Sequence, residues 1–387
     1  MTQVSTINLR IYDLRKTRQL SQKDLADELG VSVQTVSKWE NHVCMPDITM
    51  LPDIARFFQV SVDELLGLSP LTGEEYIPVR SGEKDYWDSR LDYLKASRKT
   101  MWNDDYIGFL VKEVWKIDKP VNVLDCGCGF GYMRMMLMPL FPEGSTYTGI
   151  DFNAHLLQEA ENLFQKEETG YKAEFVCDDF IKHSFRNHYD VTISQCTMRH
   201  VNEPQQFLQK MIAQTKSGGM VVAIDVNREL ESDGLYIDGM DYAELCQRTG
   251  FRKMWIKEKE YQGRDYAIGM RLPLMMREEG LRHVDVRMND RVTFVYPECE
   301  DYAKAVECFL EEKNWRHGIS AETEEKIVRE FMNHGMDRKE AENYCRIQRK
   351  MQAYMAENKD SLKYLHSRGL LISYGWKSKE SRDKLAI

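Results

Sequence analysis

A short apolar run that ends in a glycine-rich turn is the feature of this sequence that most restricts its fold. Residues 121–131 read V-N-V-L-D-C-G-C-G-F-G, in which Asp125 precedes three glycines at alternate positions, Gly127, Gly129 and Gly131. A buried strand that breaks into glycines can turn sharply into a helix, which leaves backbone amides and bare Cα surface for a nucleotide-like ligand. We therefore expect a doubly wound α/β domain that binds such a ligand after its first strand.

An acidic residue follows the next strand-like run. Asp151 comes twenty residues after Gly131, directly after residues 147–150, and a carboxylate there suits the hydroxyls of a ribose. Dinucleotide-binding turns space their last two glycines three apart, whereas this turn reads G-x-G-x-G. The turn resembles motif I of the class I S-adenosylmethionine-dependent methyltransferases. The resemblance continues in order through residues 149–151, 175–180, 189–194 and 216–225.

The resemblance implies a role for each matching position. Asp125 shapes the turn and holds the methionine ammonium indirectly, and Asp151 binds the ribose. Phe152 flanks the adenine, Asp178 accepts from its amino group, and the amide of Asp179 donates to its ring. The remaining expected cofactor contacts are Gly127, Cys128, Gly129, Gly131, Phe180 and the backbone around Gln195, which faces the sulfonium. Two alternatives stay open: glycines that serve only tight turns, and a nicotinamide enzyme.

The first seventy residues have a different pattern. One expected helix begins after Ser21 and stops at Gly30, and a second one follows that buries Val33, Val36 and Trp39. Two short helices joined by a glycine-containing turn are typical of a helix-turn-helix. Residues 7–68 resemble phage-repressor-like domains of the xenobiotic-response-element (XRE) family. The resemblance implies contacts to double-stranded DNA from Gln22, Gln34, Thr35, Ser37 and Lys38.

The charge of this region tempers that expectation. Residues 1–70 hold seven Lys and Arg against nine Asp and Glu, a net charge of −2. Non-specific affinity for DNA should therefore be modest and strongly salt-sensitive. We expect DNA binding to need a homodimer that presents two such faces. The alternative is a helix-turn-helix retained for dimerisation or docking.

The domain organisation follows from these patterns. We expect a helix-turn-helix domain over residues 1–68, a linker over 69–83 and a methyltransferase domain over 84–387. The latter comprises lid helices at 84–119, a cofactor-binding core at 120–228 and a helical insertion at 300–365 between strands at 283–288 and 370–376. Tyr93, Trp102 and Asn103 are candidates to contact the methionine end, although aromatic residues at helical spacing are more often core.

The expected chemistry needs little from side chains, because methyl transfer depends mainly on holding the acceptor close to the sulfonium and collinear with it. His200 is the nearest candidate for a base, and a helix-capping role is the more favoured reading for it. DNA is rejected as acceptor, because residues 194–198, S-Q-C-T-M, lack the motifs of DNA methyltransferases. Cys126, Cys128, Cys177 and Cys196 follow expected strands, and small apolar filling is favoured over a role in metalloid binding or redox sensing.

Bulk properties fit this interpretation. The chain has 387 residues, a net charge of −9 and a pI near 5.6, and its first residues lack an export signal. The nine cysteines lack the spacing of a disulfide framework, which fits reduced thiols in a cytoplasmic protein. We expect neither a membrane partner nor a bound metal. We expect a methyltransferase for a small molecule with a DNA-binding regulatory domain. The alternative is a transcriptional regulator that senses S-adenosylmethionine or S-adenosylhomocysteine without turnover.

Overall fold

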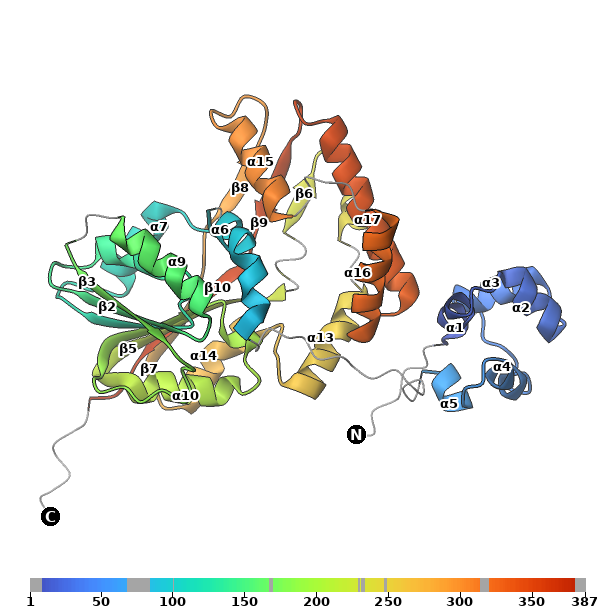
Figure 1. Ribbon diagram of the computed structural model, residues 1–387, viewed down its shortest axis with the longest axis horizontal. Coiled ribbons are helices and arrows are strands. Elements are labelled where there is room, and N and C mark those ends of the chain that lie inside the picture. The colour runs from blue at the N-terminus through green and yellow to red at the C-terminus, as the bar shows by residue number, and fades with distance from the viewer. Residues whose placement is uncertain are drawn as a thin grey trace, which may run out of the picture. The chain divides into compact units, whose positions relative to one another are not determined.

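The computed structural model describes residues 9–67, 84–99, 101–166, 170–228, 230, 234–246, 249–313 and 320–379. The expected linker at 69–83 lies outside these residues. The chain divides into two compact units. The first comprises Met1–Ile77, Thr249–Met254 and Ile319–Arg346, and the second comprises Pro78–Arg248, Trp255–Gly318 and Ile347–Ile387. Figure 1 shows both.

A seven-stranded sheet forms the centre of the second unit, in the order β3-β2-β1-β4-β5-β10-β7. The strands are β1 (Asn122–Cys126), β2 (Thr146–Asp151), β3 (Lys172–Cys177), β4 (Tyr189–Gln195), β5 (Thr215–Val226), β7 (Arg282–Met288) and β10 (Leu370–Trp376). The first five are parallel, and β10 runs antiparallel between β5 and β7. The strand order reverses between β1 and β4, where doubly wound sheets open a ligand crevice at the carboxyl ends of their strands. The predicted α/β fold is confirmed.

Both faces of the sheet are buried at its central strands β1, β4 and β5, where apolar side chains point to the two sides. Val123, Val191 and Ile193 pack on one face, and Leu124 and Cys126 pack on the other. The first face is covered by α7 (Asp104–Phe109), η3 (Leu110–Val114) and α8 (Tyr132–Leu137), and the second by α10 (Pro204–Gln214) and α14 (Ile268–Glu278). Helix α9 (Ala154–Gln165) packs on β2 and β3. Figure 1 shows helices on the two sides of the sheet.

Shorter elements complete the second unit. Two helices precede the sheet in sequence, η2 (Lys84–Arg90) and α6 (Leu91–Lys99). The connections between later strands contain η4 (Met138–Leu140), η5 (Met198–His200), α12 (Tyr242–Leu245) and α13 (Thr249–Gln262), of which the part from Trp255 onward belongs to this unit. A second sheet of three antiparallel strands, β6-β9-β8, consists of β6 (Leu235–Ile237), β8 (Val292–Val295) and β9 (Tyr364–Ser367).

The segment between β7 and β10 differs from a purely helical insertion. It begins with β8 and ends with β9, and these strands flank α15 (Tyr302–Glu312), α16 (Ala321–Asn333) and α17 (Arg338–Glu357). Within the second unit, Val306 and Phe309 of α15 pack with Tyr364 of β9 in a core of their own. Within the first unit, α16 and the first part of α17 pack around Val328, Met336 and the neighbouring residues of α13.

Five helices build the helix-turn-helix core of the first unit. They are α1 (Ile11–Thr17), α2 (Gln22–Leu29), α3 (Val33–Glu40), α4 (Leu51–Phe57) and α5 (Val62–Leu65). As predicted, Ser21 caps α2 and Gly30 ends it in a left-handed conformation with φ 65°. Ser32 caps α3, and Val36 and Trp39 are buried. The expectation that Val33 is buried is wrong: Val33 is 39% exposed, because it occupies the first turn of α3 on the outward side.

No helix within the described ranges combines the length and the apolar character that crossing a membrane requires. The cytoplasmic location stays a prediction.

Candidate functional site

The glycine turn after β1 forms the centre of the site. Gly127, Gly129 and Gly131 have φ values of 77°, 53° and 77°, which glycine adopts without strain. The turn is fixed to β2, since the amides of Gly127 and Cys128 both donate to the carbonyl oxygen of Ile150, at 2.9 and 3.1 Å. A helix, α8, begins directly after Gly131. The turn is thus a rigid backbone surface at the point where the strand order reverses.

Asp151 joins this turn to the end of β2. Its Oδ2 accepts from the amide of Gly129 at 2.8 Å, and its Oδ1 accepts from the amide of Asn153 at 2.9 Å. Burial raises the pKa of Asp151, which these amide donors counteract. Each carboxylate oxygen can accept a further hydrogen bond. The carboxylate is therefore held in a fixed orientation beside the glycine turn and can still receive hydroxyl groups.

Asp125 lies beneath the turn at 1% exposure. Its Oδ2 accepts from the hydroxyl of Tyr147 on β2 at 2.7 Å. Burial raises the pKa of Asp125 from 3.8 to about 7, while the Tyr147 hydrogen bond lowers it and the nearby charge of Asp151 raises it. A cation bound above the turn would favour the ionised form of this carboxyl group.

The end of β3 differs in one detail from what the resemblance implies. The amide of Asp179, expected to donate to an adenine ring, donates instead to Oδ1 of Asp178 at 2.8 Å. The other oxygen of Asp178 lies 2.9 Å from Nδ1 of His183. Phe180 is 6% exposed and packs on Phe207 with ring centroids 4.7 Å apart, so its ring belongs to the core. Phe152, by contrast, is only partly buried at the start of the turn into α9.

The segment after α6 lies against the end of β4. Nε2 of Gln195 donates to the sulfur of Met101 at 3.2 Å, and the neighbouring Trp102 is 5% exposed. The indole Nε1 of Trp102 is buried and has no acceptor among the residues that the structure describes. Asn103 is directed differently, since its side chain bonds to Asp290 and Arg291. Tyr93 is 44% exposed.

These features fit S-adenosylmethionine. A buried indole N–H without a partner is costly unless a ligand supplies an acceptor. A β-carbon at Gly129 would meet only Leu156 at 3.9 Å, so the space above the turn is open to a ligand. The donor set also suits this molecule, because Asp151 can receive hydroxyls and Asp125 can balance an ammonium group.

His200 has a setting that disfavours a general base. Nε of Arg199 lies 3.1 Å from His200 Nε2, and Nη2 of Arg264 lies 3.2 Å from Nδ1, so both ring nitrogens face arginine donors. Burial, followed by the charges of these and two further arginines, lowers the pKa of His200 well below 6.5. The ring of Trp87 packs on it edge to face at 5.2 Å. A neutral imidazole accepts through one of these nitrogens only, and the surrounding arginine charges keep the ring from binding a second proton.

The four cysteines after the strands do not form one cluster of thiolates. Cys126 and Cys128 are buried, and burial raises the pKa of both thiols. Cys177 is exposed. Cys196 follows β4 with φ 54°, an uncommon value for a residue other than glycine, and its amide donates to Ile224 at 2.7 Å. The buried pair acts as small apolar filling beneath the turn.

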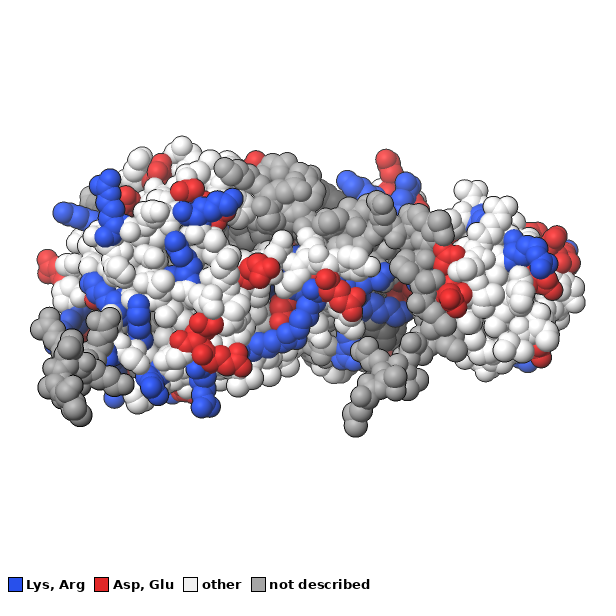
Figure 2. All heavy atoms as spheres, turned by 90° about the horizontal axis from the view of Figure 1, so that it is seen from below, with Lys and Arg blue, Asp and Glu red and all other residues white. Residues whose placement is uncertain are grey.

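On the helix-turn-helix domain, α3 carries most of the expected DNA contacts. Gln34 and Lys38 are exposed, and Thr35 and Ser37 are partly buried. Nε2 of Gln22 donates to Glu40 at 2.7 Å, and Glu40 itself pairs with the buried Arg15. In the face drawn in Figure 2, basic and acidic side chains are interspersed on this domain and on the larger unit alike.

Several residues that shape the site were not expected from the sequence. Tyr147 partners Asp125, Met101 contacts Gln195, and Asn153 caps α9 while donating to Asp88 at 2.9 Å. Tyr147 was detectable in principle, because the alternation along β2 places it on the face that Asp125 shares. The contact of Met101 with Gln195 and that of Asn153 with Asp88 each span more than sixty residues of sequence, which no local pattern reveals.

Family comparisons agree with both resemblances. Residues 117–266 match the family described as "Methyltransferase domain", and residues 11–65 match the family described as "Helix-turn-helix". Together with the sheet order, these matches confirm the two resemblances.

Individual relatives cover parts of the chain. A ubiquinone biosynthesis O-methyltransferase from Klebsiella pneumoniae is 29% identical over 37% of this chain and 58% of its own. The HTH-type transcriptional activator BcrR from Enterococcus faecalis is 38% identical over 20% of this chain and 35% of its own. Among solved structures, Haemonchus contortus phosphoethanolamine N-methyltransferase 2 with S-adenosyl-L-methionine has a TM-score of 0.42 at 14% identity, covering 78% of this chain and 59% of that one.

The chain thus spans between about a third and three fifths of the length of the curated relatives quoted. The two regions that match family models do not overlap in sequence. The polypeptide accordingly joins a helix-turn-helix domain to a methyltransferase domain.

Proposed function

We propose that this protein transfers a methyl group from S-adenosylmethionine to a small molecule, and that its N-terminal domain binds double-stranded DNA. The observation that carries the first part is the hydrogen bond between the Gly129 amide and Asp151 at 2.8 Å. It joins a bare backbone surface to an oriented carboxylate at the switch point of the sheet. One part suits the amino-acid end of the cofactor, and the other suits its sugar.

S-adenosylmethionine supplies a methyl group on positively charged sulfur. A lone pair of the acceptor attacks the methyl carbon, the carbon–sulfur bond breaks, and the sulfur leaves as a neutral thioether. A hydroxyl or amine acceptor also loses a proton. The chain's contribution is binding, orientation and exclusion of water. Met101 and Trp102, each about 5% exposed or less, cover the end of β4. The strained backbone at Cys196 fixes the direction in which the chain leaves that strand.

The second candidate function is a regulator that binds the same cofactor, or its product, without turnover. The attached helix-turn-helix domain favours it, because its exposed recognition residues lie on α3 as in DNA-reading domains. In this reading the glycine turn and Asp151 act as a sensor site, and cofactor occupancy alters DNA affinity.

Calorimetry on the full chain tests the shared part of both candidates. We expect S-adenosylhomocysteine to bind, and Asp151→Ala to weaken binding at least tenfold, because hydrogen bonds to a charged group contribute about 1.5–3 kcal/mol. Asp118→Ala, at an exposed carboxylate ahead of β1, is the matched control and should leave binding unchanged. Absence of binding by folded wild-type protein would contradict both candidates.

Turnover separates the two candidates. The full chain is incubated with S-adenosylmethionine and a small-molecule cell extract, and S-adenosylhomocysteine is measured over time. Production that depends on the extract supports the enzyme. No production, together with selected DNA sites whose affinity changes more than threefold on adding S-adenosylhomocysteine, supports the regulator.

A further inference from the structure

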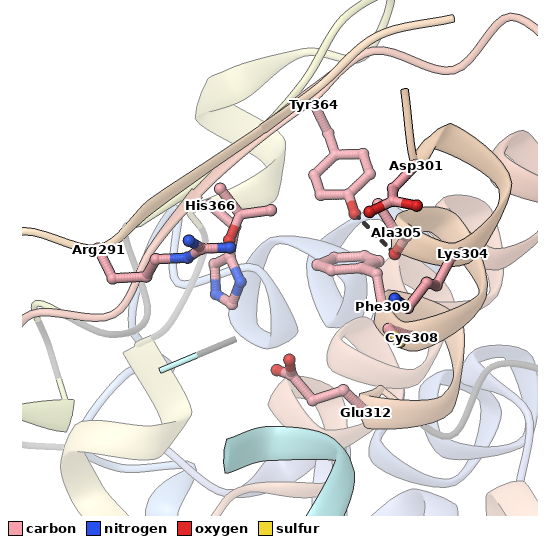
Figure 3. Close-up of a pocket in the computed structure, with 10 residues that line it drawn as sticks. Arg291, Asp301, Lys304, Ala305, Cys308, Phe309, Glu312, Tyr364 and His366 are labelled. Atoms are coloured by element: carbon pink, nitrogen blue, oxygen red, sulfur yellow. Dashed lines mark hydrogen bonds between the residues drawn. The ribbon is translucent and has the colours of Figure 1, made fainter. Parts of the chain in front are cut away.

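A cavity of about 480 Å³ lies within the second unit, between α15 and the strands β8 and β9. Its size suits one small molecule. Figure 3 shows side chains of α15 facing those of the two strands across this space. The side chains that matter below are Arg291, Asp301, Lys304, Phe309, Glu312 and Tyr364.

One wall of the cavity is aromatic. Phe309 is 3% exposed, and its ring lies 4.5 Å from that of Tyr364 and 5.6 Å from that of His366, measured between centroids. The Tyr364 hydroxyl is directed to the Ala305 carbonyl oxygen at 3.2 Å, which fixes this ring. A wall of fixed rings favours a planar, ring-bearing guest over a flexible chain.

The charges around the cavity leave an excess of donors. Nη1 of Arg291 donates to Oδ1 of Asn103 at 2.6 Å, but its buried Nε has no acceptor within the described part of the chain. Lys304, on α15, makes no hydrogen bond or ion pair with a described residue. Glu312 is already neutralised, because it forms a buried ion pair with Arg368. The remaining carboxylate, Asp301, is exposed, as is Lys304, so Arg291 is the unneutralised charge that is partly buried in the lining, and it favours an anion.

Residues 101–103 link the lining of this cavity to the end of β4. Met101 receives the hydrogen bond from Gln195 at the end of β4, and its carbonyl oxygen accepts from Asn289 at 2.8 Å. Two residues later, Asn103 bonds to Arg291. Tyr132 directly follows the glycine turn, and burial raises its pKa to about 12. The positive charges of Arg368 and Arg291 act in the opposite direction on this pKa. One segment therefore contacts both the end of β4 and a residue that lines the cavity.

We propose that this cavity binds the methyl acceptor, and that the acceptor is a planar ring compound with a carboxylate or phosphate group. Arg291 and Lys304 bind the anionic group, and the ring lies against Phe309. The inference rests on the proposed methyltransferase function, since only a methyl donor in the neighbouring turn makes this guest an acceptor.

Ligand-observed NMR on the full chain with S-adenosylhomocysteine tests the proposal. The probes are benzoate, phenyl phosphate, benzyl alcohol and benzylamine, which share a ring and differ in charge. We expect benzoate or phenyl phosphate to bind at least tenfold more tightly than benzyl alcohol, and benzylamine to bind least. The stronger of the two anions tells carboxylate from phosphate. Transferred magnetisation between the bound anion and S-adenosylhomocysteine should also be visible.

Two variants locate the binding. Arg291→Met should remove the preference for the anion, and Lys304→Met, on the exposed side of α15, should reduce it without risk to the fold. Arg282→Met, an exposed arginine on β7 outside the cavity, is the matched control and should retain it. Binding of S-adenosylhomocysteine is measured in every variant, so that loss of the cofactor site is detected separately.

Three results would overturn the inference. They are equal affinity for benzyl alcohol and the anions, unchanged preference in both cavity variants, and an anion that binds without magnetisation transfer to the bound nucleoside. Failure of the wild-type chain to bind S-adenosylhomocysteine would instead contradict the proposed function, even if Arg291 still selected anions.

Discussion

The carboxyl group of Asp125 lies inside the sheet, where burial favours its protonated form. Its pKa rises from 3.8 to about 7. Between these two values the folded protein holds a proton that the unfolded chain releases, so stability falls as pH rises from about 4 to 7. The shift corresponds to up to about 4 kcal/mol. We expect Asp125→Asn, which can still accept from Tyr147, to remove most of this loss.

Urea unfolding at pH 5 and pH 8 measures the effect of Asp125. Tryptophan fluorescence reports mainly on the methyltransferase domain, because six of the seven tryptophans follow residue 80. The midpoint of Asp125→Asn should rise relative to wild type at both pH values, about three times as much at pH 8 as at pH 5, because only part of the loss has set in at pH 5. The exposed Asp118→Asn serves as control. An equal effect of Asp125→Asn at both pH values would show that the group is ionised across this range.

His200 gives a second prediction at this scale. Its two ring nitrogens face Arg199 and Arg264, and its pKa lies well below 6.5, so it stays neutral throughout the physiological range. The pH profile of the methyl-transfer rate should therefore show no ionisation near pH 6.5 that is due to His200. Wild type and His200→Gln should have pH profiles of the same shape in this range. NMR titration of the histidine side chains checks the same point directly. A His200 resonance that titrates near pH 6.5 would refute this assignment.

Single residues were predicted unevenly from the sequence. Asp151 and the glycines lie where the spacing implied, because short-range pattern fixes a strand, its turn and the next strand. The amide of Asp179 donates to the Asp178 side chain, a local hydrogen bond that the expected adenine contact did not include. Such competition between side chain and backbone leaves no trace in residue spacing.

At the scale of the element, the glycine turn makes a comparison between two alanine variants informative. A β-carbon at Gly127 would lie 2.5 Å from Thr197 Cγ2, whereas one at Gly129 would meet only Leu156 at 3.9 Å. Both positions have positive φ. We expect Gly127→Ala to lower the free energy of unfolding by about 2 kcal/mol or more, and Gly129→Ala by about 1 kcal/mol.

Cofactor affinity should follow a different order from stability. The β-carbon of Gly129→Ala enters the space above the turn, so S-adenosylhomocysteine should bind at least tenfold more weakly to this variant in spite of its milder effect on folding. The second replacement Thr197→Ser removes Cγ2 and should partly restore the stability of Gly127→Ala. If Gly129→Ala binds S-adenosylhomocysteine as wild type does, the cofactor does not occupy this surface.

The elements of the large sheet were predictable, and those of the small sheet were not. Strands such as β4 and β5 are buried on both faces and read as apolar runs. Strand β8 has four residues, of which Val292 and Phe294 are exposed, and its partner β9 lies about seventy residues further along the chain. A short strand exposed on one face and paired over a long distance has no local signal.

At the scale of the whole molecule, the two domains predict two separable binding activities. The full chain should bind selected DNA sites with an affinity that falls as salt rises. Lys38→Ala on α3 should make the slope of log affinity against log salt about one unit shallower, because one phosphate contact is lost. Lys112→Ala, at an exposed lysine of the methyltransferase domain, should change nothing. An unchanged slope in Lys38→Ala would argue against α3 as the DNA-contacting helix.

The division of the chain into two kinds of domain followed from sequence, but its compact units did not. The first unit gathers Thr249–Met254 and Ile319–Arg346 with the N-terminal region. These segments lie far from that region in sequence and carry ordinary amphipathic helices, so composition alone cannot assign them.

The position of β10 has a consequence for synthesis. This strand fills the gap between β5 and β7, yet it follows every other described strand in sequence. A nascent chain can complete its helix-turn-helix region early, whereas the large sheet stays split until residue 376 has left the ribosome. Once β5 and β7 have been made, their facing edges stay unpaired until β10 emerges, so the growing polypeptide depends on protection from aggregation during the later part of its translation.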